Sequence, residues 1–305
     1  MKLTYIPITV KLNFDIPIKF DIPPLFVLRS VLGWQLRRLC CIATDAKCQD
    51  CKYHKSCVYS YVFETILDKT NQVQQGINRA SHPFVFSDDN KVKLYEPIKT
   101  YSFKITLIGK AVDYIPYIYA ALQKAGSKGL LKNRIPFKVE RLLYKSDELL
   151  INDEKINTNF SKLIWDKSFA TKKSKATEIL VQLKSPLRFK SNGKYSTNFT
   201  AEQFFSCLER RYKTLFLLYG EGEDISELSY KSDKITISDR NLKWQDSKHY
   251  SARQRNVMKL GGAVGNFLLK GNFTEAQLSL LEFSKIFSAG KNTNFGLGQI
   301  DYWIR

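Results

Sequence analysis

The chain has 305 residues, of which 44% are hydrophobic, 13% aromatic and 25% charged. This content is enough to bury cores and excludes a chain that is disordered throughout, and the length suits one large domain or two of about 100–150 residues. The longest apolar run, near Tyr114–Leu122, is about half of what a membrane-spanning helix needs, and Lys11, Asn13 and Asp15 interrupt the apolar start that a secretory signal would need. We therefore expect a cytoplasmic protein with no membrane partner.

Positive charge is in excess, because 48 Lys and Arg face 29 Asp and Glu and give a formal net charge of +19. Such an excess predicts a polyanionic partner, most often nucleic acid, although ordinary solvated surface lysines are the alternative. The basic residues gather in three groups: Lys172, Lys173 and Lys175; Lys184, Arg188, Lys190 and Lys194; and Lys243, Lys248, Arg253, Arg255 and Lys259, with Trp244 and Tyr250 among them. Basic residues interleaved with aromatic rings favour single-stranded or looped RNA.

In the first half of the chain, apolar periodicity and turn residues predict the following elements. They are a strand over 3–20, a helix over Leu25–Leu39 that carries Arg37 and Arg38, a cysteine-rich segment Cys40–Cys57, short strands Pro83–Phe86 and Lys91–Leu94, a longer strand Lys99–Gly109, a helix over Asp113–Ala125 ended by Gly126, and a strand Pro136–Tyr144.

The sequence of the second half predicts a similar series of strands and helices. It has a strand Glu178–Phe189, a helix Glu202–Tyr219, a strand pair Lys243–Arg253 and Val257–Leu269, a helix from the N-cap Thr274 to Ser288 with Gln277 completing a capping box, and a last strand Gln299–Ile304.

The order β-α-β-β-α-β thus occurs twice, which predicts an α+β fold of two tandem ferredoxin-like domains. The expected domains are 1–150, with a cysteine-rich insertion at about 40–60, and 176–305, with 151–175 as a polar, lysine-rich linker. Residues 290–298, GKNTNFGLG, form a glycine-rich loop before the last strand. Such a loop can bring backbone N–H groups to a phosphate, and a tight helix-to-strand turn is an equally good interpretation.

Several motifs together resemble the CRISPR precursor-RNA-processing endoribonucleases of the RAMP (repeat-associated mysterious protein) superfamily. The matching pieces are Tyr250-Ser251-x-Arg253-Gln254, Gly261-Gly262 with Gly265, Gly290-Lys291 leading to Phe295-Gly296-Leu297-Gly298, Ser185-Pro186-Leu187-Arg188, and the first helix followed by cysteines and Tyr61-x-Phe63-Glu64. The resemblance implies cleavage within CRISPR repeat RNA, with that RNA as partner. Other CRISPR-associated proteins and a second copy of the chain are further candidate partners.

The residues that we expect to bind RNA lie on the first helix, on the basic strands and in the glycine-rich loop. They are Arg37, Arg38, Arg188, Lys248, Arg253, Gly290, Lys291, Gly296 and Gly298.

The cysteines indicate a metal site. Five of the six lie within Cys40–Cys57, and the spacing Cys41-x6-Cys48-x2-Cys51-x5-Cys57 lets four sulfurs converge on one tetrahedral ion. Cys40 could replace Cys41 on spacing alone, whereas the resemblance favours Cys41. A structural zinc ion is the expected occupant, an iron–sulfur cluster the second interpretation and metal-free thiols the third. The sixth, Cys207, lies on an apolar helix face and is expected in the core.

The resemblance implies RNA cleavage without a metal, in which the ribose 2′-OH attacks the adjacent phosphate and leaves a 2′,3′-cyclic phosphate and a 5′-OH. That reaction needs a base, an acid and a cation. The family often places a histidine base near the first helix, but Gly33–Arg38 contains none. The candidates are His249, beside Tyr250 in the basic strand pair, then His54, and then a histidine-free site that uses Tyr250 and nearby basic residues, whereas His82 is expected to be structural.

Two other classes of function stay open. The first is a catalytically inactive RNA-binding subunit of a CRISPR effector complex, which the missing helix histidine favours. The second is a zinc-bearing structural or DNA-binding protein, which the position of the basic groups disfavours because they lie mainly outside the half with the cysteines.

Overall fold

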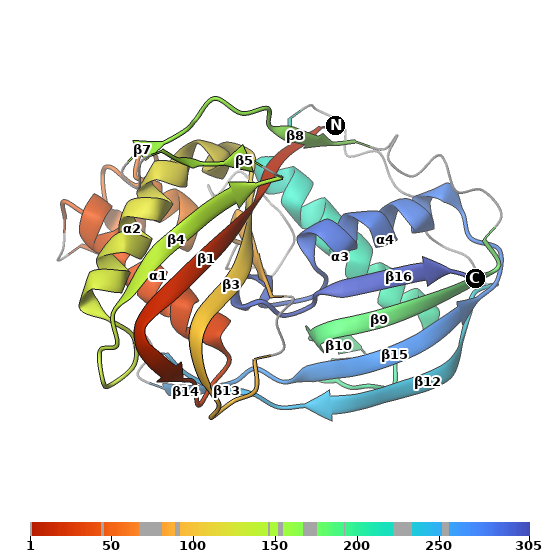
Figure 1. The fold of residues 1–305 in the computed structure, drawn as a ribbon. Coiled ribbons are helices and arrows are strands. Elements are labelled where there is room, and N and C mark those ends of the chain that lie inside the picture. Colours follow the sequence, from red (N-terminus) through yellow and green to blue (C-terminus); the bar gives the residue numbers. More distant parts are fainter. Residues whose placement is uncertain are drawn as a thin grey trace. The chain divides into compact units, whose positions relative to one another are not determined.

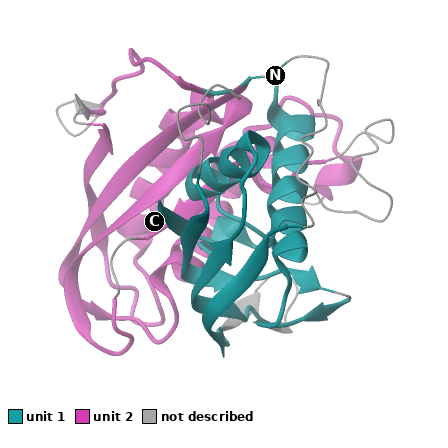
Figure 2. Ribbon diagram, turned by 90° about the vertical axis from the view of Figure 1, so that its right-hand side faces the viewer, with its two compact units in different colours: residues 1–2, 165–305 teal, residues 3–164 magenta. Residues whose placement is uncertain are grey.

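The computed structural model describes residues 2–43, 46–66, 81–88, 92–145, 147–151, 155–166, 176–191, 193–221, 234–251 and 256–305. The chain forms two compact units (Figure 2). We call residues 3–164 the N-terminal unit, and residues 1–2 with 165–305 the C-terminal unit. Each unit is a mixed α/β structure built on an antiparallel sheet (Figure 1).

The elements of the N-terminal unit are β1 (Leu3–Lys19), α1 (Pro24–Cys40), the turns η1 (Cys48–Asp50) and η2 (Ser60–Glu64), β2 (Phe84–Ser87), β3 (Pro97–Ile108), η3 (Gly109–Tyr114), α2 (Ile115–Lys128), β4 (Phe137–Tyr144), β5 (Asp147–Glu148), β6 (Leu150–Ile151) and β7 (Lys155–Ile156). The strand β8 (Leu163–Trp165) lies at the boundary of the units and pairs with β1.

The sheet of this unit has the order β2-β3-β1-β4-β5, so the first strand is central. Alternate residues of β1, among them Ile8, Val10 and Leu12, are buried, as the alternating sequence predicts. The helices α1 and α2 contact each other and lie side by side (Figure 1). Among the helices that the structure describes, none is long and apolar enough to cross a membrane.

Two predictions in this half are wrong. The described residues of the short strand expected at Lys91–Leu94 form no strand. A turn begins at Leu94, where the Tyr95 N–H donates to the Phe20 carbonyl at 2.8 Å and the Glu96 N–H donates to the Lys93 carbonyl. Gly126 does not end its helix, since α2 continues to Lys128 and Gly129 caps it with φ +76°. Gly126 instead allows close packing, because a Cβ there would lie 2.1 Å from the carbonyl oxygen of Phe137.

The C-terminal unit contains β9 (Glu178–Leu187), β10 (Lys190–Ser191), β11 (Lys194–Tyr195), α3 (Ala201–Tyr219), β12 (Thr236–Gln245), β13 (Lys248–Ser251), β14 (Asn256–Lys259), β15 (Gly262–Lys270), α4 (Glu275–Phe287), η5 (Thr293–Phe295) and β16 (Ile300–Ile304). Its main sheet has the order β12-β15-β9-β16, and α3 and α4 contact each other (Figure 1).

The strand pair predicted in this unit differs from the structure. It begins earlier, at Thr236, and is divided into β12 with β15 and β13 with β14. The hydrogen bond from Leu260 N–H to the Ser247 carbonyl, 2.7 Å long, lies between the two ladders. The capping box of Thr274 and Gln277 is confirmed at the start of α4. A second capping box, formed by Thr200 and Gln203 at the start of α3, was not predicted.

Trp165 is the centre of the aromatic core in the C-terminal unit. Its side chain is fully buried, and its ring meets those of Tyr212, Phe216 and Phe283 edge-on at centroid distances of 5.4, 5.6 and 5.1 Å. Such edge-to-face contacts add to the stabilisation that burial of the rings gives. The core therefore joins α3 and α4 to a residue that the sequence analysis had assigned to the linker.

Candidate nucleic-acid interface and cysteine pocket

Cationic and aromatic side chains gather at one end of β9 in the C-terminal unit. The guanidinium carbon of Arg188 lies 3.9 Å from the ring centroid of Tyr195, and the Lys190 ammonium lies 5.7 Å from the same ring. The ring of Trp244 follows, 6.4 Å from that of Tyr195. Lys291 is joined to Arg188 by the backbone hydrogen bond described below. We call these five residues the Arg188 patch: Arg188, Lys190, Tyr195, Trp244 and Lys291.

Two side-chain hydrogen bonds hold this patch in place. Nη1 of Arg188 donates to the Gly261 carbonyl at 2.7 Å, and Nε1 of Trp244 donates to Oδ1 of Asp246 at 2.9 Å. A Cβ on Gly261 would lie 2.3 Å from that carboxylate oxygen, so the backbone passes too close to admit a side chain. Arg188 thus keeps a fixed position on the strand end, while Lys190, Trp244 and Lys291 are exposed.

The glycine-rich loop is folded against the end of β9. The N–H of Lys291 donates to the Arg188 carbonyl at 2.8 Å, the N–H of Gly298 donates to Pro186 at 3.1 Å, and the N–H of Ala289 donates to Gly298 at 2.8 Å. Gly296 and Gly298 are buried, whereas Lys291 is exposed. These N–H groups therefore face the protein rather than a phosphate, and the loop offers the Lys291 side chain instead.

Arg37 and Arg38, on α1 of the N-terminal unit, differ in their surroundings. The guanidinium of Arg38 lies 4.7 Å from the ring centroid of Trp34, whose side chain is 53% exposed. Arg37 instead lies 6.0 Å from the Tyr59 ring, beside the cysteines. Arg38 and Trp34 therefore form a second exposed cationic and aromatic pair, whereas Arg37 lies beside Tyr59, which lines the cysteine pocket described below.

The remaining predicted RNA contacts fall largely outside the described residues. Lys248, His249 and Tyr250 belong to β13 by their backbone, opposite β14, but their side chains are not among those that the structure describes. Arg253 lies outside the described residues altogether. Their roles in RNA binding and cleavage stay predictions.

His54 and His82 have defined partners. Nδ1 of His54 lies 2.8 Å from the Cys51 carbonyl oxygen, which only accepts, so Nδ1 carries the proton and Nε2 is the basic nitrogen of the neutral ring. The His82 ring stacks on Phe84 at 5.8 Å, and its Nε2 lies 3.5 Å from a guanidinium nitrogen of Arg29.

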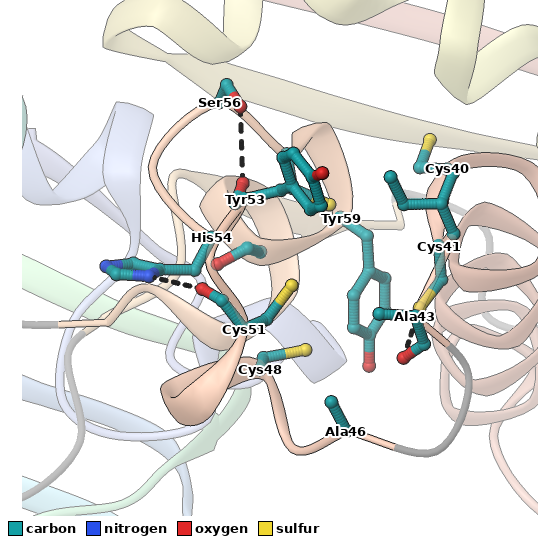
Figure 3. Close-up of a pocket in the computed structure, with 13 residues that line it drawn as sticks. Cys40, Cys41, Ala43, Ala46, Cys48, Cys51, Tyr53, His54, Ser56 and Tyr59 are labelled. Atoms are coloured by element: carbon teal, nitrogen blue, oxygen red, sulfur yellow. Dashed lines mark hydrogen bonds between the residues drawn. The ribbon is translucent and has the colours of Figure 1, made fainter.

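The cysteines of residues 40–57 line one cavity of about 200 Å³ (Figure 3). Its walls include the thiols of Cys40, Cys41, Cys48, Cys51 and Cys57, together with Tyr53, His54 and Tyr59. The His54 ring points away from the labelled sulfurs (Figure 3). Over the described part of the chain, no group of three or more His, Cys, Asp or Glu is close enough to hold a metal ion as the side chains stand. Cys207 is buried, and burial raises the pKa of its thiol to about 12.

Family models match both halves of the chain. Residues 3–163 match the AF_1859_N model, described as an N-terminal domain, and residues 181–300 match the CRISPR-associated endoribonuclease Cas6. The chain belongs to the Cas6 family of CRISPR-associated RAMP-type proteins. The endoribonuclease match over residues 181–300 supports an RNA-cleaving enzyme of the kind that processes CRISPR repeat RNA.

Solved Cas6 structures share this fold. A Cas6 product complex (TTHB231) has a TM-score of 0.58 at 13% identity and covers 98% of this chain and 100% of its own. Thermus thermophilus Cas6 has 0.53 at 11%, covering 99% of both chains. A partial Cas6-RT-Cas1–Cas2 complex has 0.54 at 16%, covering 99% of this chain and 46% of its own. A search of curated proteins finds no match.

The Cas6 match contains the whole Arg188 patch. Arg188 and Lys291 were predicted from the sequence, and Lys190 and Trp244 were noted in basic groups. Tyr195 was not predicted, although it stands directly after Lys194 in a short polar stretch, and an aromatic residue beside a lysine is itself a signal for nucleic-acid binding.

Proposed function

We propose that this Cas6-family chain cleaves CRISPR repeat RNA without a metal, by attack of a ribose 2′-OH on the adjacent phosphate. The products are a 2′,3′-cyclic phosphate and a 5′-OH. The observation that carries the proposal is the Cas6 endoribonuclease match over residues 181–300, which contain the Arg188 patch. We also propose that both units are ferredoxin-like domains, which their shared β-α-β-β-α-β order and their sheet orders support.

The Arg188 patch suits a phosphodiester backbone with bases turned outward. Arg188 and Lys291 supply positive charge for phosphates, and the exposed Trp244 ring supplies a face on which a base can stack. Because Nη1 of Arg188 already donates to Gly261, its other guanidinium N–H groups can point to a phosphate without movement of the residue. This arrangement favours RNA that is single-stranded or looped where it contacts the patch.

Proton transfer needs a base at the 2′-OH and an acid at the leaving 5′-oxygen. His249 is our first candidate for the base because it lies on β13, next to Tyr250 and close in sequence to Lys248 and Arg253. His54 is the second, through its Nε2, since Nδ1 is bonded to Cys51. Tyr250 with neighbouring cations is the third. The cations of the patch would stabilise the extra negative charge of the phosphorane.

The nucleophile can be tested directly in the RNA. The chain is incubated in EDTA with labelled repeat RNA, the cleaved position is mapped, and that nucleotide is then replaced by its 2′-deoxy form. We expect cleavage of the natural RNA in EDTA, no cleavage of the deoxy RNA, and equal binding of both. A deoxy substitution one nucleotide away is the matched control and should be cleaved. Cleavage that needs a divalent metal, or that survives the deoxy substitution, contradicts the mechanism.

Variants then identify the base. His249→Ala should slow single-turnover cleavage by about 10²–10⁴-fold with little change in binding, whereas His54→Ala should leave the rate within a few fold. The opposite result would assign the base to His54, and normal rates in both would point to Tyr250.

The second candidate function, an RNA-binding subunit without cleavage, is favoured by the absence of histidine from Pro24–Cys40 and would show as tight binding without product.

A further inference from the structure

The cysteines of the pocket have no role in the proposed cleavage, and the pocket brings together segments that are apart in the sequence. Cys40 and Cys41 lie at the end of α1, Cys48 and Cys51 lie on the turn η1 and just after it, and Cys57 lies before η2. All five cysteines line the same cavity of about 200 Å³, and Figure 3 labels Cys40, Cys41, Cys48 and Cys51. A cavity of this size holds far more than the volume that a single ion occupies, so the thiols have room to move inward.

The C-x2-C pair has a backbone suited to holding an ion. The N–H of Cys51 donates to the Cys48 carbonyl at 3.3 Å, which closes a tight turn, and the N–H of His54 donates to the Cys51 carbonyl at 3.1 Å. The labelled sulfurs of Cys48 and Cys51 consequently lie on the same side of the cavity (Figure 3). Two thiols held on one short turn form half of a tetrahedral ligand set.

We propose that Cys41, Cys48, Cys51 and Cys57 bind one zinc ion. On binding, the four thiols lose four protons to solvent, and Zn²⁺ with four thiolates carries a net charge of −2, which Arg37 partly balances. Because the sulfurs do not form a ready metal-holding group in the described residues, binding must draw them together by rotation of the cysteine side chains. A closed four-thiolate site leaves no open position for substrate, so the ion stabilises the fold and takes no part in cleavage.

The structure separates Cys41 from Cys40. Cys40 is the last residue of α1 and packs against the hydrophobic core. Cys41 lies just beyond the helix, and its thiol donates to the Ala43 carbonyl at 3.4 Å, toward the segment that carries Cys48. Cys40→Ser is therefore the matched control, since it changes a thiol of the same cavity that lies outside the proposed ligand set.

The test is metal analysis of the full chain, purified with reductant and without chelator. We expect about one zinc per wild-type chain and per Cys40→Ser chain, and a severalfold lower content in Cys51→Ser. Equal zinc loss in Cys40→Ser and Cys51→Ser overturns the ligand set. Iron with visible absorbance overturns zinc as the occupant, and metal-free protein with disulfides found by mass spectrometry overturns the site.

A second measurement holds even where Cys51→Ser misfolds. Wild-type chain stripped of metal is titrated with Co²⁺ under reductant, because cobalt reports its ligands through its visible spectrum. We expect the intense charge-transfer and d–d bands of tetrahedral cobalt with thiolate ligands, lost when one equivalent of Zn²⁺ is added. A spectrum like that of cobalt in buffer overturns the proposal. Neither measurement depends on RNA cleavage, so the zinc proposal can fail while the proposed function stands.

Discussion

Gly298→Ala distinguishes a glycine needed for packing from one needed for a ligand. Gly298 has φ +76°, and a Cβ there would lie 1.8 Å from the carbonyl oxygen of Ala289, a separation that atoms do not tolerate. The backbone would have to move, which breaks the hydrogen bonds from Gly298 to Pro186 and from Ala289 to Gly298. Gly193 is the matched control, because its φ is +79° but nothing lies within 4 Å of a Cβ at that position.

The two variants share one cost and differ in another. In both variants, an alanine side chain in the left-handed region destabilises the fold by about 1–2 kcal/mol. Replacing glycine also lowers the conformational entropy of the unfolded chain, which stabilises the fold by about 0.4–1 kcal/mol. Gly298→Ala additionally loses two backbone hydrogen bonds in a buried loop, each about 1 kcal/mol or more. We therefore expect the free energy of unfolding to fall by about 1 kcal/mol or less in Gly193→Ala and by about 3 kcal/mol in Gly298→Ala.

Urea unfolding followed by tryptophan fluorescence measures the difference, since Trp165 lies in the core of the same unit. Binding of repeat RNA is measured in parallel at a temperature where both variants are folded. If Gly298→Ala unfolds like Gly193→Ala yet binds RNA much more weakly, then the glycine serves the ligand and the packing argument is wrong.

Three further predictions concern charge and core. Arg188→Ala should weaken RNA binding about tenfold and lower the salt slope by about 1, while Arg188→Lys keeps the slope; an unchanged slope in Arg188→Ala would remove the residue from the interface. Trp165→Ala should lower the free energy of unfolding by about 3–5 kcal/mol, and a loss under about 1 kcal/mol would contradict its central place. Burial opposes ionisation of Asp301, but a hydrogen bond from Lys285 and the charges of Lys285 and Lys184 outweigh it and lower its pKa. The stability that a carboxyl with a lowered pKa contributes is lost as pH falls. The difference in free energy of unfolding between wild type and Asp301→Asn, measured in urea, should therefore shrink between about pH 6 and pH 3. A difference that grows as pH falls would refute the assignment.

Elements whose signals are local were predictable from the sequence. The alternation in Leu3–Lys19 and the helical spacing in Pro24–Cys40 need no knowledge of distant residues, and the Thr274 cap depends only on the next turn. The failures depend on partners far along the chain. Gly126 looks like a helix stop until Phe137 is seen against it, and the turn before Tyr95 is fixed by Phe20.

The candidate sites follow the same division. Residue type and spacing single out Arg188 and the cysteines, because charge and thiol chemistry are visible in the letters. The stacking of Arg188 on Tyr195 is not, since it needs the β10–β11 hairpin to return the chain to the strand end. The glycine-rich loop is the clearest case, because its N–H groups look available in the sequence, whereas in the fold those of Lys291 and Gly298 donate to the carbonyls of Arg188 and Pro186.

The hydrogen bond from Lys291 to the Arg188 carbonyl has a consequence for binding entropy. It joins the backbones of two cationic residues that are about a hundred positions apart in the chain, at 2.8 Å, before any ligand arrives. A polyanion that engages both side chains then has to order only their rotamers, at about 0.5–1.5 kcal/mol each, and no loop. The cost of organising this surface is met when the chain folds, so the charge of each phosphate contact contributes more fully to affinity.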